Sequence, residues 1–430
     1  MKNKRLIVMS VDALVYEDLE YLADKPNFGY MLQNGANVKT IRSIYPSLTY
    51  PCHTSIMTGA YPEKHGISNN EKPIMGVTNS DWFQFAESVK CRDIFSAAKE
   101  AGLTTASVFW PVTGCHKDID YLIDEYAPLG NEPARNAYLR SGTSPELYDR
   151  VVAKNIEGVV ICRHPETDYF ILNCACDIIR EYKPNLLMLH PSNVDSCRHS
   201  YGVFSPQLKT ALDETEEFLG MLVSATKEAG VYEETNFLIV SDHGQMNYCR
   251  SSALNSVFLS EGLIEVDENN HIKSWKAFCK PTGFSAQIYL KDKKDKRIYD
   301  LVYNLLCGLR DTGVNGIREV YTTAEIKKLE RLDGDFSFVV DSDLFTIFQS
   351  AWNVKPIHNN SFIQYYCHGC HGHWPDKGPQ PTLIAFGPAI KKGAVVERRP
   401  IVDEAPTFAK ILDCGFLPDA DGTPITEIII

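Results

Sequence analysis

The chain lacks several features that would assign it at once to a class of protein. No apolar run among its 430 residues approaches the roughly 20 residues that a membrane-spanning helix needs. Basic residues are in deficit, with 43 Lys and Arg against 55 Asp and Glu and a formal charge of −12. This balance argues against a surface for nucleic-acid polymers, which bind through clustered Lys and Arg, but not against a small anionic substrate.

The start of the sequence also predicts no export signal. The apolar run from Leu6 to Met9 is short and the acid Asp12 follows closely, which favours a first strand over a signal peptide. Thirteen cysteines in a chain without such a signal predict reduced thiols and a cytoplasmic protein. Cys367 and Cys370 form a single C-x-x-C, and without a second pair this is more typical of two ordinary thiols than of a zinc or redox site.

Short apolar runs alternate with helix-like patterns along the chain. Strands that alternate with helices predict βαβ units, so we expect an α/β fold with a doubly wound, largely parallel central sheet and helices on both faces. Three strand-like runs lead into an acid, which suits the sheet edge where α/β proteins bind ligands. The strand-like runs are 6–11, 185–190, 236–241 and 382–386, and the helix-like segments include 93–101, 205–230 and 403–412.

The pattern of strand-like and helix-like segments changes between residues 251 and 363. A helix-like pattern at 297–310 and strand-like pieces at 284–290 and 336–340 predict a small α+β insertion or lid. The lysine-rich loop from Lys291 to Lys296 is more typical of a solvated turn than of a polyanion contact. We therefore expect a catalytic core made of residues 1–250 and 364–430, and an insertion made of residues 251–363.

One stretch, residues 43–70, places a hydroxyl just before a proline and a helix-like run. It reads SIYPSLTYPCHTSIMTGAYPEKHGISNN, with Thr49 two residues before Pro51. Thr is a good N-cap and Pro favours the first turn of a helix, so Thr49 is expected where backbone N–H groups and the helix dipole favour an anion. The stretch alone is also compatible with a threonine that only caps a helix.

Seven oxygen- and nitrogen-bearing side chains follow strand-like runs or lie in Gly-rich loops. A spacing of four places two of them on one helical face. Each one alone is more often a cap or a polar core group, but together they suit two Zn²⁺ or similar divalent ions, roughly 3.5–4 Å apart. The seven are Asp12, Thr49, Asp195, His199, Asp242, His243 and His371.

These motifs resemble the alkaline phosphatase superfamily, most closely its nucleotide pyrophosphatase/phosphodiesterase branch. The likeness extends from residue 6 to about residue 390, without the insertion. It is carried by VDAL at Asp12, the stretch 43–70, the D-x-x-x-H of Asp195 and His199 followed by Tyr201-Gly202, SDHGQM at Asp242 and GCHGHWP at His371.

The resemblance implies a role for each of these residues. One metal ion would be held by Asp195, His199 and His371, and a second by Asp12, Asp242 and His243. Thr49 would be the nucleophile beside the second ion, and Asn70 would hydrogen-bond a phosphoryl oxygen.

Two features of the motifs leave questions open. Cys52 stands where the branch commonly has Asn, which puts substrate contacts near the nucleophile in doubt. The run around His371 also offers His368 and His373 as ligands, and the G-x-H-G context favours His371.

The predicted reaction is hydrolysis of phosphodiester or pyrophosphate bonds in small, nucleotide-like phosphorylated substrates through a phosphothreonine. Metal coordination would make the weak threonine nucleophile reactive. Neither the arginine clamp nor the third metal site of the monoesterases can be assigned. Hydrolysis of phosphonates, sulfates or phosphate monoesters is the enzymatic alternative, and an inactive metal-binding or ligand-binding protein is the other. Aromatic residues that are candidates to stack a leaving group, or else core, are Tyr50, Trp82, Phe83, Phe109 and Trp110.

Overall fold

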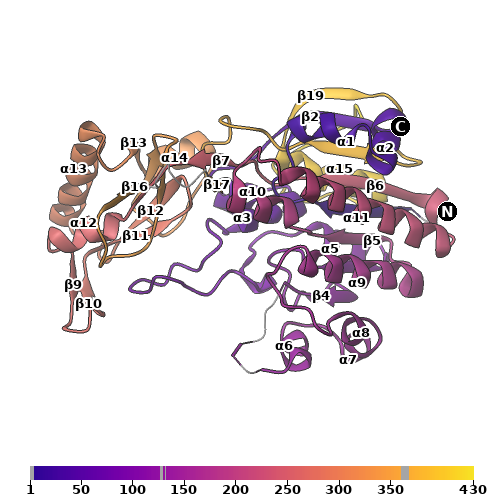
Figure 1. Cartoon of the computed structure of the whole chain (residues 1–430), viewed down its shortest axis with the longest axis horizontal. Helices are drawn as coiled ribbons and strands as arrows, with labels where there is room; N and C mark the ends of the chain where they lie inside the picture. The colour runs from indigo at the N-terminus through magenta and orange to yellow at the C-terminus, as the bar shows by residue number, and fades with distance from the viewer. Residues whose placement is uncertain (1–3, 126–128, 131, 360–367) are drawn as a thin grey trace.

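An eight-stranded mixed sheet forms the centre of the protein in the computed structural model, which describes residues 4–125, 129–130, 132–359 and 368–430 (Figure 1). Only β18 runs antiparallel to its neighbours β2 and β6, and the other five pairings are parallel. The predicted α/β fold with a largely parallel sheet is confirmed. In sheet order, the strands are β19 (Val395–Pro400), β2 (Ala36–Arg42), β18 (Leu383–Phe386), β6 (Thr235–Val240), β1 (Arg5–Ser10), β5 (Leu186–Leu189), β3 (Thr105–Val108) and β4 (Tyr121–Ile123).

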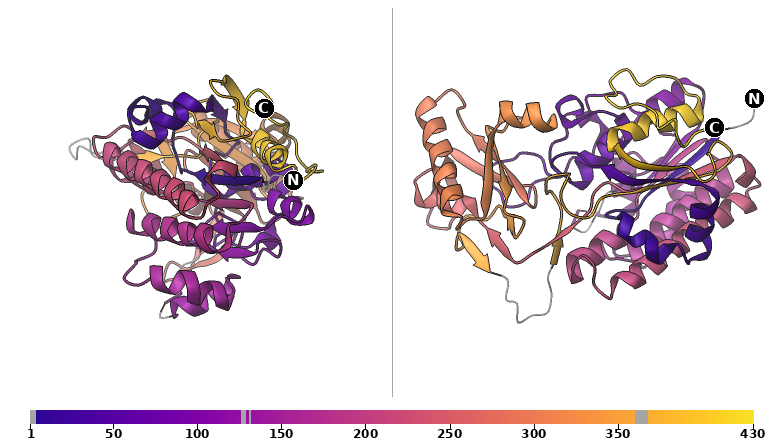
Figure 2. Two further views of the ribbon diagram at one scale, coloured as in Figure 1. Left: turned by 90° about the vertical axis from the view of Figure 1, so that its right-hand side faces the viewer. Right: turned by 90° about the horizontal axis from the view of Figure 1, so that it is seen from above.

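Alternate residues of the central strands enter two different apolar cores. In β1, Ile7 and Met9 pack into one core, whereas Leu6 and Val8 pack into the other, as the two-residue period of a strand requires. Helices therefore cover both faces, and Figure 2 shows the sheet between the two helical layers. One layer contains α2 (Pro26–Asn34), α9 (Glu166–Tyr182) and α11 (Leu208–Glu228), and the other contains α3 (Thr49–Thr58), α5 (Ile94–Glu100) and α15 (Glu404–Leu412).

The strands and helices expected from periodicity are present within a few residues of their predicted bounds. Four strands of the sheet were not predicted, namely β2, β3, β4 and β19. Two of these are short, and β2 and β19 carry charged residues among their apolar ones because they lie at or next to a sheet edge. The apolar runs that predicted the other strands come from positions buried on both faces.

A second unit with its own core lies at the end of the molecule away from the chain termini (Figure 1). It is built on a four-stranded antiparallel sheet of order β11-β12-β14-β13. Its elements are α12 (Leu254–Ser260), β9 (Ile264–Val266), β10 (Ile272–Trp275), β11 (Ala277–Pro281), β12 (Ser285–Leu290), α13 (Lys296–Thr312), β13 (Ile317–Thr322), α14 (Thr323–Glu330) and β14 (Phe338–Ser342).

A small three-stranded sheet joins the two ends of this insertion. The strand β8 (Arg250–Ser252) pairs with β15 (Thr346–Phe348) and with β16 (Ile357–Asn359). The predicted first boundary, at residues 250 and 251, therefore falls inside β8. The predicted second boundary, at residues 363 and 364, lies outside the described residues.

The remaining elements are short and connect the larger ones. None of the helices in the described part of the chain is both long and apolar enough to span a membrane. The short helices are α1 (Leu19–Leu22), α4 (Pro62–His65), α6 (Ala134–Arg140), α7 (Pro145–Leu147), α8 (Ala153–Asn155) and the π-helical η3 (Tyr148–Val152), and the 3₁₀ turns are η1 (Tyr16–Asp18), η2 (Ala86–Ser88), η4 (Tyr232–Glu234) and η5 (Ile401–Asp403).

Candidate active site

The carboxyl ends of three adjacent parallel strands bring the predicted ligands to one edge of the sheet. Asp12 lies two residues after β1, and Asp242 and His243 follow β6 after one intervening residue, Ser241. The neighbouring strand β5 leads into α10 (Asn193–Tyr201), which carries Asp195 and His199. Because β5, β1 and β6 are adjacent and parallel, their loops converge at the edge where α/β proteins bind ligands.

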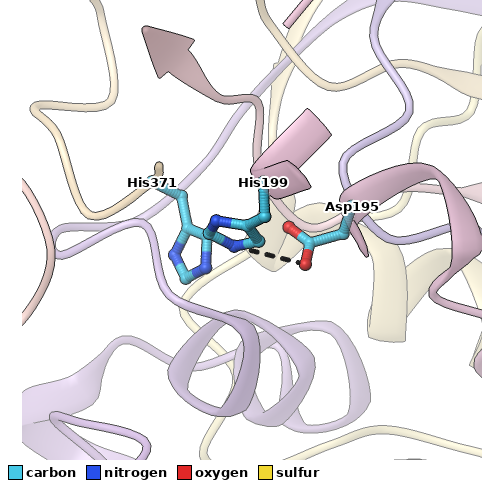
Figure 3. Close-up of side chains that lie close together, drawn as sticks. All are labelled: Asp195, His199 and His371. Atoms are coloured by element: carbon cyan, nitrogen blue, oxygen red, sulfur yellow. Dashed lines mark ion pairs between the residues drawn. The ribbon is translucent and has the colours of Figure 1, made fainter. Parts of the chain in front are cut away.

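Asp195, His199 and His371 form one group of ligand atoms that all lie within 4.8 Å of one another (Figure 3). The Nε2 of His199 lies 3.4 Å from Asp195 Oδ2, one helical turn away. His371 follows the short strand β17 (His368–Cys370), which pairs with β7 (Met246–Tyr248). The Nδ1–H of His199 donates to the Gly369 carbonyl over 2.8 Å, so in the neutral ring Nε2 is the nitrogen with a free lone pair.

A second group of ligand atoms lies beside the first and consists of Asp12, Asp195 and His243. The Nε2 of His243 is 3.5 Å from Asp12 Oδ1 and 3.1 Å from Asp242 Oδ2. Its ring also stacks on that of His371 at 4.1 Å between centroids. The two groups are therefore contiguous and form one site.

Several ligand atoms of this site are buried without a hydrogen-bond partner in the described part of the chain. They are Asp12 Oδ1, Asp242 Oδ2, His243 Nδ1 and His371 Nδ1. Burial and neighbouring carboxylates raise the pKa of Asp12 and of Asp242 well above the ordinary value. Burial lowers the pKa of His243 well below its ordinary value and lowers that of His371 to about 4. Buried acids and neutral histidines with free lone pairs fit divalent cations, whose charge offsets that of the carboxylates.

Thr49 lies against the second group of ligands. Its Oγ1 is 3.2 Å from His243 Nε2. The predicted capping role of Thr49 is wrong, because α3 begins at Thr49, its N-cap is Leu48 in an extended conformation, and no side chain caps the helix. The hydroxyl is turned toward the ligands instead, at the helix end where the dipole favours an anion.

Asn70 and Tyr50 meet at the same helix end. The side-chain Oδ1 of Asn70 accepts a hydrogen bond from the Tyr50 backbone N–H over 2.9 Å, which leaves the amide nitrogen to donate elsewhere. The Tyr50 hydroxyl donates to Glu125 over 3.3 Å, and its ring meets the edge of Trp82 at 5.0 Å. Trp82 is 41% exposed.

The other aromatic candidates are internal. Phe109 and Trp110 belong to the two main cores, and Phe83 packs against the small cluster that contains Tyr50. Tyr50 itself is only 2% exposed, so Trp82 is the aromatic side chain that remains as a candidate for contact with a substrate.

Comparison with known proteins decides the family of this chain. The sequence model described as type I phosphodiesterase / nucleotide pyrophosphatase matches residues 6–374. The chain belongs to this family. The resemblance inferred from the motifs is confirmed.

Individual relatives of this type I phosphodiesterase family member are distant. It is 24% identical over 423 residues to human ectonucleotide pyrophosphatase/phosphodiesterase family member 5. The aligned residues cover 97% of this chain and 76% of that protein. It is 26% identical over 266 residues to human family member 1, and this alignment covers 59% of this chain and 24% of that protein. The chain spans about a quarter to a third of the length of the family member 1 proteins of human, mouse and rat.

Solved structures of family member 5 share the fold. The human protein aligns with a TM-score of 0.69 at 19% identity, covering 99% of this chain and 100% of that chain. An inactive threonine-to-alanine variant of the murine protein, in complex with AMP, aligns with a TM-score of 0.67 at 20% identity over 99% and 100% of the two chains.

Cys52, the departure from the family pattern, points away from the ligands. It is fully buried in one of the main cores, with its Sγ 3.1 Å from the hydroxyl of Ser43. Ser43 in turn donates to the Asp242 backbone carbonyl over 2.7 Å. Cys52 therefore belongs to the packing beneath Asp242, and the doubt about substrate contacts at this position has no support in the geometry.

The three neighbouring histidines of this family member have different surroundings. His371 is the one grouped with Asp195 and His199. His368 Nδ1 lies 2.9 Å from the backbone carbonyl of His199, and the His373 ring packs against Phe284. Burial lowers the pKa of His373 to about 3. The C-x-x-C is described only in part, since Cys367 lies outside the described residues.

Sequence reasoning missed two histidines that contact the site. His190 Nε2 lies 3.1 Å from Asp12 Oδ2, and the His53 ring is 4.2 Å from that of His190. The Nδ1–H of His53 donates to the Thr49 carbonyl over 2.8 Å. The position of His190 at the end of a strand-like run was a signal that could have found it, because the predicted ligands follow the same kind of run.

Sequence reasoning also missed Gln245, which lies two residues after His243 and is fully buried. Its amide Nε2 donates to both the carboxylate and the backbone carbonyl of Asp195. Gln245 thereby orients a ligand that belongs to both groups. Its own motif, SDHGQM, carried no signal for this contact, because the partner lies 50 residues earlier in the chain.

Proposed function

We propose that this protein hydrolyses phosphodiester or pyrophosphate bonds of small, nucleotide-like substrates, with Thr49 as nucleophile. The observation that carries this proposal is the position of the Thr49 hydroxyl, 3.2 Å from His243 at the start of α3 and next to buried ligand atoms without partners. Membership of the phosphodiesterase family supports the same reaction class.

The protein residues divide into those that hold metal ions and those that contact the phosphoryl group. We infer one ion at Asp195, His199 and His371, and a second at Asp12, Asp242 and His243, with Thr49 beside the second. Two divalent ions, which the mixed oxygen and nitrogen ligands favour as Zn²⁺, would lower the pKa of the Thr49 hydroxyl and neutralise charge on the leaving oxygen.

The chemistry proceeds in two displacements at phosphorus. Thr49 Oγ1 loses its proton and forms a bond to phosphorus as the bond to the leaving oxygen breaks, which yields a phosphothreonine and a free alcohol or phosphate. Water then breaks the bond between threonine and phosphorus and releases a phosphate monoester. Asn70 Nδ2 and the positive end of the α3 dipole stabilise the negative phosphoryl oxygens in both steps.

The charges around the site favour a substrate with a singly charged phosphate. The charged groups that most strongly raise the pKa of Asp12 are the carboxylates of Asp195, Glu125 and Asp168. Glu125 is not a ligand of the proposed ions, so its carboxylate would repel the second negative charge of a phosphate monoester, which the monoesterases offset with an arginine clamp. We therefore infer that diesters are preferred to monoesters.

A nucleotide-like substituent on phosphorus, either the leaving group or the ester group that is retained, is supported by two further observations. Trp82 presents an exposed ring beside Tyr50 and next to the helix that begins at Thr49, where a base can stack. The murine protein of the same fold was solved in complex with AMP.

A comparison of chromogenic esters tests the proposal against its rivals. The zinc-loaded protein is expected to hydrolyse bis-p-nitrophenyl phosphate and a nucleoside 5′-p-nitrophenyl phosphate faster than p-nitrophenyl phosphate or p-nitrophenyl sulfate. Faster turnover of the monoester, a phosphonate or the sulfate would assign one of the alternative hydrolases. Absence of turnover with both metal ions bound would instead favour a binding protein.

The cellular location stays a prediction. All twelve cysteines in the described part of the chain are free thiols. This agrees with a reducing compartment, and fractionation of the source cells with an antibody against the protein tests it.

A further inference from the structure

One turn of the insertion contacts two separate loops of the site. It consists of residues 282–284, which connect β11 and β12, together with the flanking strand residues from Lys280 to Gln287. On one side it meets the segment around Asn70, and on the other it meets the loop of His371. The insertion is therefore in direct contact with a metal ligand of the proposed function and with the two residues that precede the phosphoryl-binding Asn70.

The first contact is a short chain of hydrogen bonds that ends next to Asn70. The Tyr289 hydroxyl donates to Gln287 Oε1 over 2.9 Å, which directs the amide nitrogen of Gln287 to the Ser68 backbone carbonyl, 2.7 Å away. Gln287 is 1% exposed. Asn69 adds a bond in the opposite direction, from its Nδ2 to the Pro281 carbonyl over 3.3 Å. The two residues before Asn70 are thus bonded to the insertion.

A buried lysine of the insertion holds the other end of the same segment. Lys280, in β11, is 1% exposed, and its ammonium donates to Ser80 Oγ over 2.5 Å. It also lies 3.6 Å from the Glu71 carboxylate, which accepts a bond from the Ser80 N–H over 3.0 Å. Segment 68–80, which contains Asn70, is therefore attached to β11 and β12 at both ends.

The second contact fixes the backbone on either side of the His371 peptide. The Phe284 N–H donates to the His371 carbonyl over 3.1 Å, and the fully buried Ser285 hydroxyl donates to the Gly372 carbonyl over 2.8 Å. Gly283 makes this approach possible: it has φ of +74°, and a Cβ there would lie 2.1 Å from the His371 oxygen.

We propose that the β11–β12 turn is the positioning element of the site, which sets Asn70 through Gln287 and His371 through Ser285. This inference rests on the proposed function for the roles of Asn70 and His371. It assigns the insertion a fixed role in the site, rather than that of a lid that swings free. Each buried carbonyl would lose its partner if the turn moved, and such losses are costly. Rates also depend steeply on how reacting groups are placed.

The Gln287 contact is tested with Gln287→Met, which keeps the size of the side chain and removes the donor. We expect kcat toward bis-p-nitrophenyl phosphate to fall about 10- to 100-fold while two zinc ions remain bound. The matched control is Asn255→Leu. Asn255 is a buried amide of the same insertion, and among the described residues it bonds only to insertion carbonyls and to the Cys279 N–H. Wild-type kcat in Gln287→Met, or an equal loss per folded molecule in Asn255→Leu, would overturn the inference.

A milder variant keeps the test valid if Gln287→Met does not fold. Tyr289→Phe retains the ring and removes only the hydroxyl that orients Gln287. We expect kcat to fall about fivefold, the effect of one lost hydrogen bond, with KM and zinc content unchanged. An unchanged kcat in folded Tyr289→Phe would contradict the proposed chain of bonds to Asn70.

The Ser285 contact is tested by zinc binding, without reference to turnover. In equilibrium dialysis with Zn²⁺ alone, Ser285→Ala is expected to bind one of the two ions about 10- to 100-fold more weakly than wild type, and the other with unchanged affinity. The control Ser260→Ala removes a hydroxyl whose hydrogen bond, in the described part of the chain, goes to Ser256 within α12. Wild-type affinity for both ions in Ser285→Ala would overturn this part.

Failure of the proposed function and failure of the positioning inference give different experimental results. A zinc-loaded wild type without phosphodiesterase activity would defeat the proposed function. The dialysis of Ser285→Ala against Ser260→Ala would still decide whether the insertion positions His371.

Discussion

The imidazole of His190 hydrogen-bonds the carboxylate of Asp12, with 3.1 Å between Nε2 and Oδ2. One oxygen of Asp12 is thus occupied, and the other, Oδ1, faces His243 without a hydrogen-bond partner among the described residues. A histidine that holds one oxygen of a ligand carboxylate fixes the direction in which the other oxygen points.

Replacement of His190 should therefore weaken one metal site selectively. His190→Phe keeps the ring beside His53 and removes the donor. We expect the ion at Asp12 to bind about 10- to 100-fold more weakly in zinc dialysis, with the other ion unaffected. His65→Phe serves as the control because His65 is also a buried histidine but bonds to Ser55, outside the metal ligands. Equal loss of both ions would indicate a general structural defect.

Thr49→Ala should abolish turnover and leave the fold and metal binding intact. Loss of a nucleophile is expected to lower kcat by about 10⁴- to 10⁶-fold, because the remaining groups cannot form the covalent intermediate. Six other ligands remain to hold zinc. Steady-state kinetics with bis-p-nitrophenyl phosphate measure the effect, and Thr49→Ser, which retains a hydroxyl, is the conservative control. Zinc-dependent turnover that persists in Thr49→Ala would show that another group attacks phosphorus.

Removal of metal should reduce stability as well as activity. The unpartnered buried atoms of Asp12, Asp242, His243 and His371 have no compensating charge without it. At a free zinc concentration of 100 times Kd, each ion should add about 2.7 kcal/mol to the free energy of unfolding. Thermal unfolding after chelation and after return of zinc measures this. Calcium, which prefers oxygen ligands, should give a smaller shift, and equal shifts would contradict a site of mixed nitrogen and oxygen ligands.

His65 should make stability depend on pH in the acid range. Burial lowers its pKa to about 3 from an ordinary value of 6.5. Its Nδ1 accepts a bond from the Ile67 N–H, which requires the neutral ring. Between these two pKa values the unfolded chain binds a proton that the folded protein does not. Stability therefore falls as pH decreases from 6.5 toward 3, by up to about 1.4 kcal/mol per pH unit.

The measurement for this prediction is the urea midpoint at pH 7 and at pH 4.5. His65→Gln lacks the titrating ring, so the wild type should lose more stability between the two pH values than this variant does. His271→Gln is the control, since His271 is largely exposed, with 79% of its side chain accessible. Equal pH dependence in wild type and His65→Gln would show that the folded protein accommodates a charged His65.

The sequence by itself determined the alternation of strands and helices, the largely parallel sheet and the family. Apolar runs such as 6–11 and 236–241 are long enough to be recognised because their strands are buried on both faces. The edge strand β19, with two arginines and a glutamate, carries no such signal. Motif residues also named the ligand candidates, since parallel strands place their carboxyl ends at one edge of the sheet.

Only the tertiary structure decided how side chains from distant segments meet. It directed Cys52 into the core, grouped His371 rather than His368 with Asp195, and placed His190 and Gln245 behind the ligands. It also brought the insertion to the site, through contacts between residues more than 80 positions apart. Local sequence encodes the period of a strand or helix, whereas the direction of each side chain across such separations is set by close packing of the whole chain.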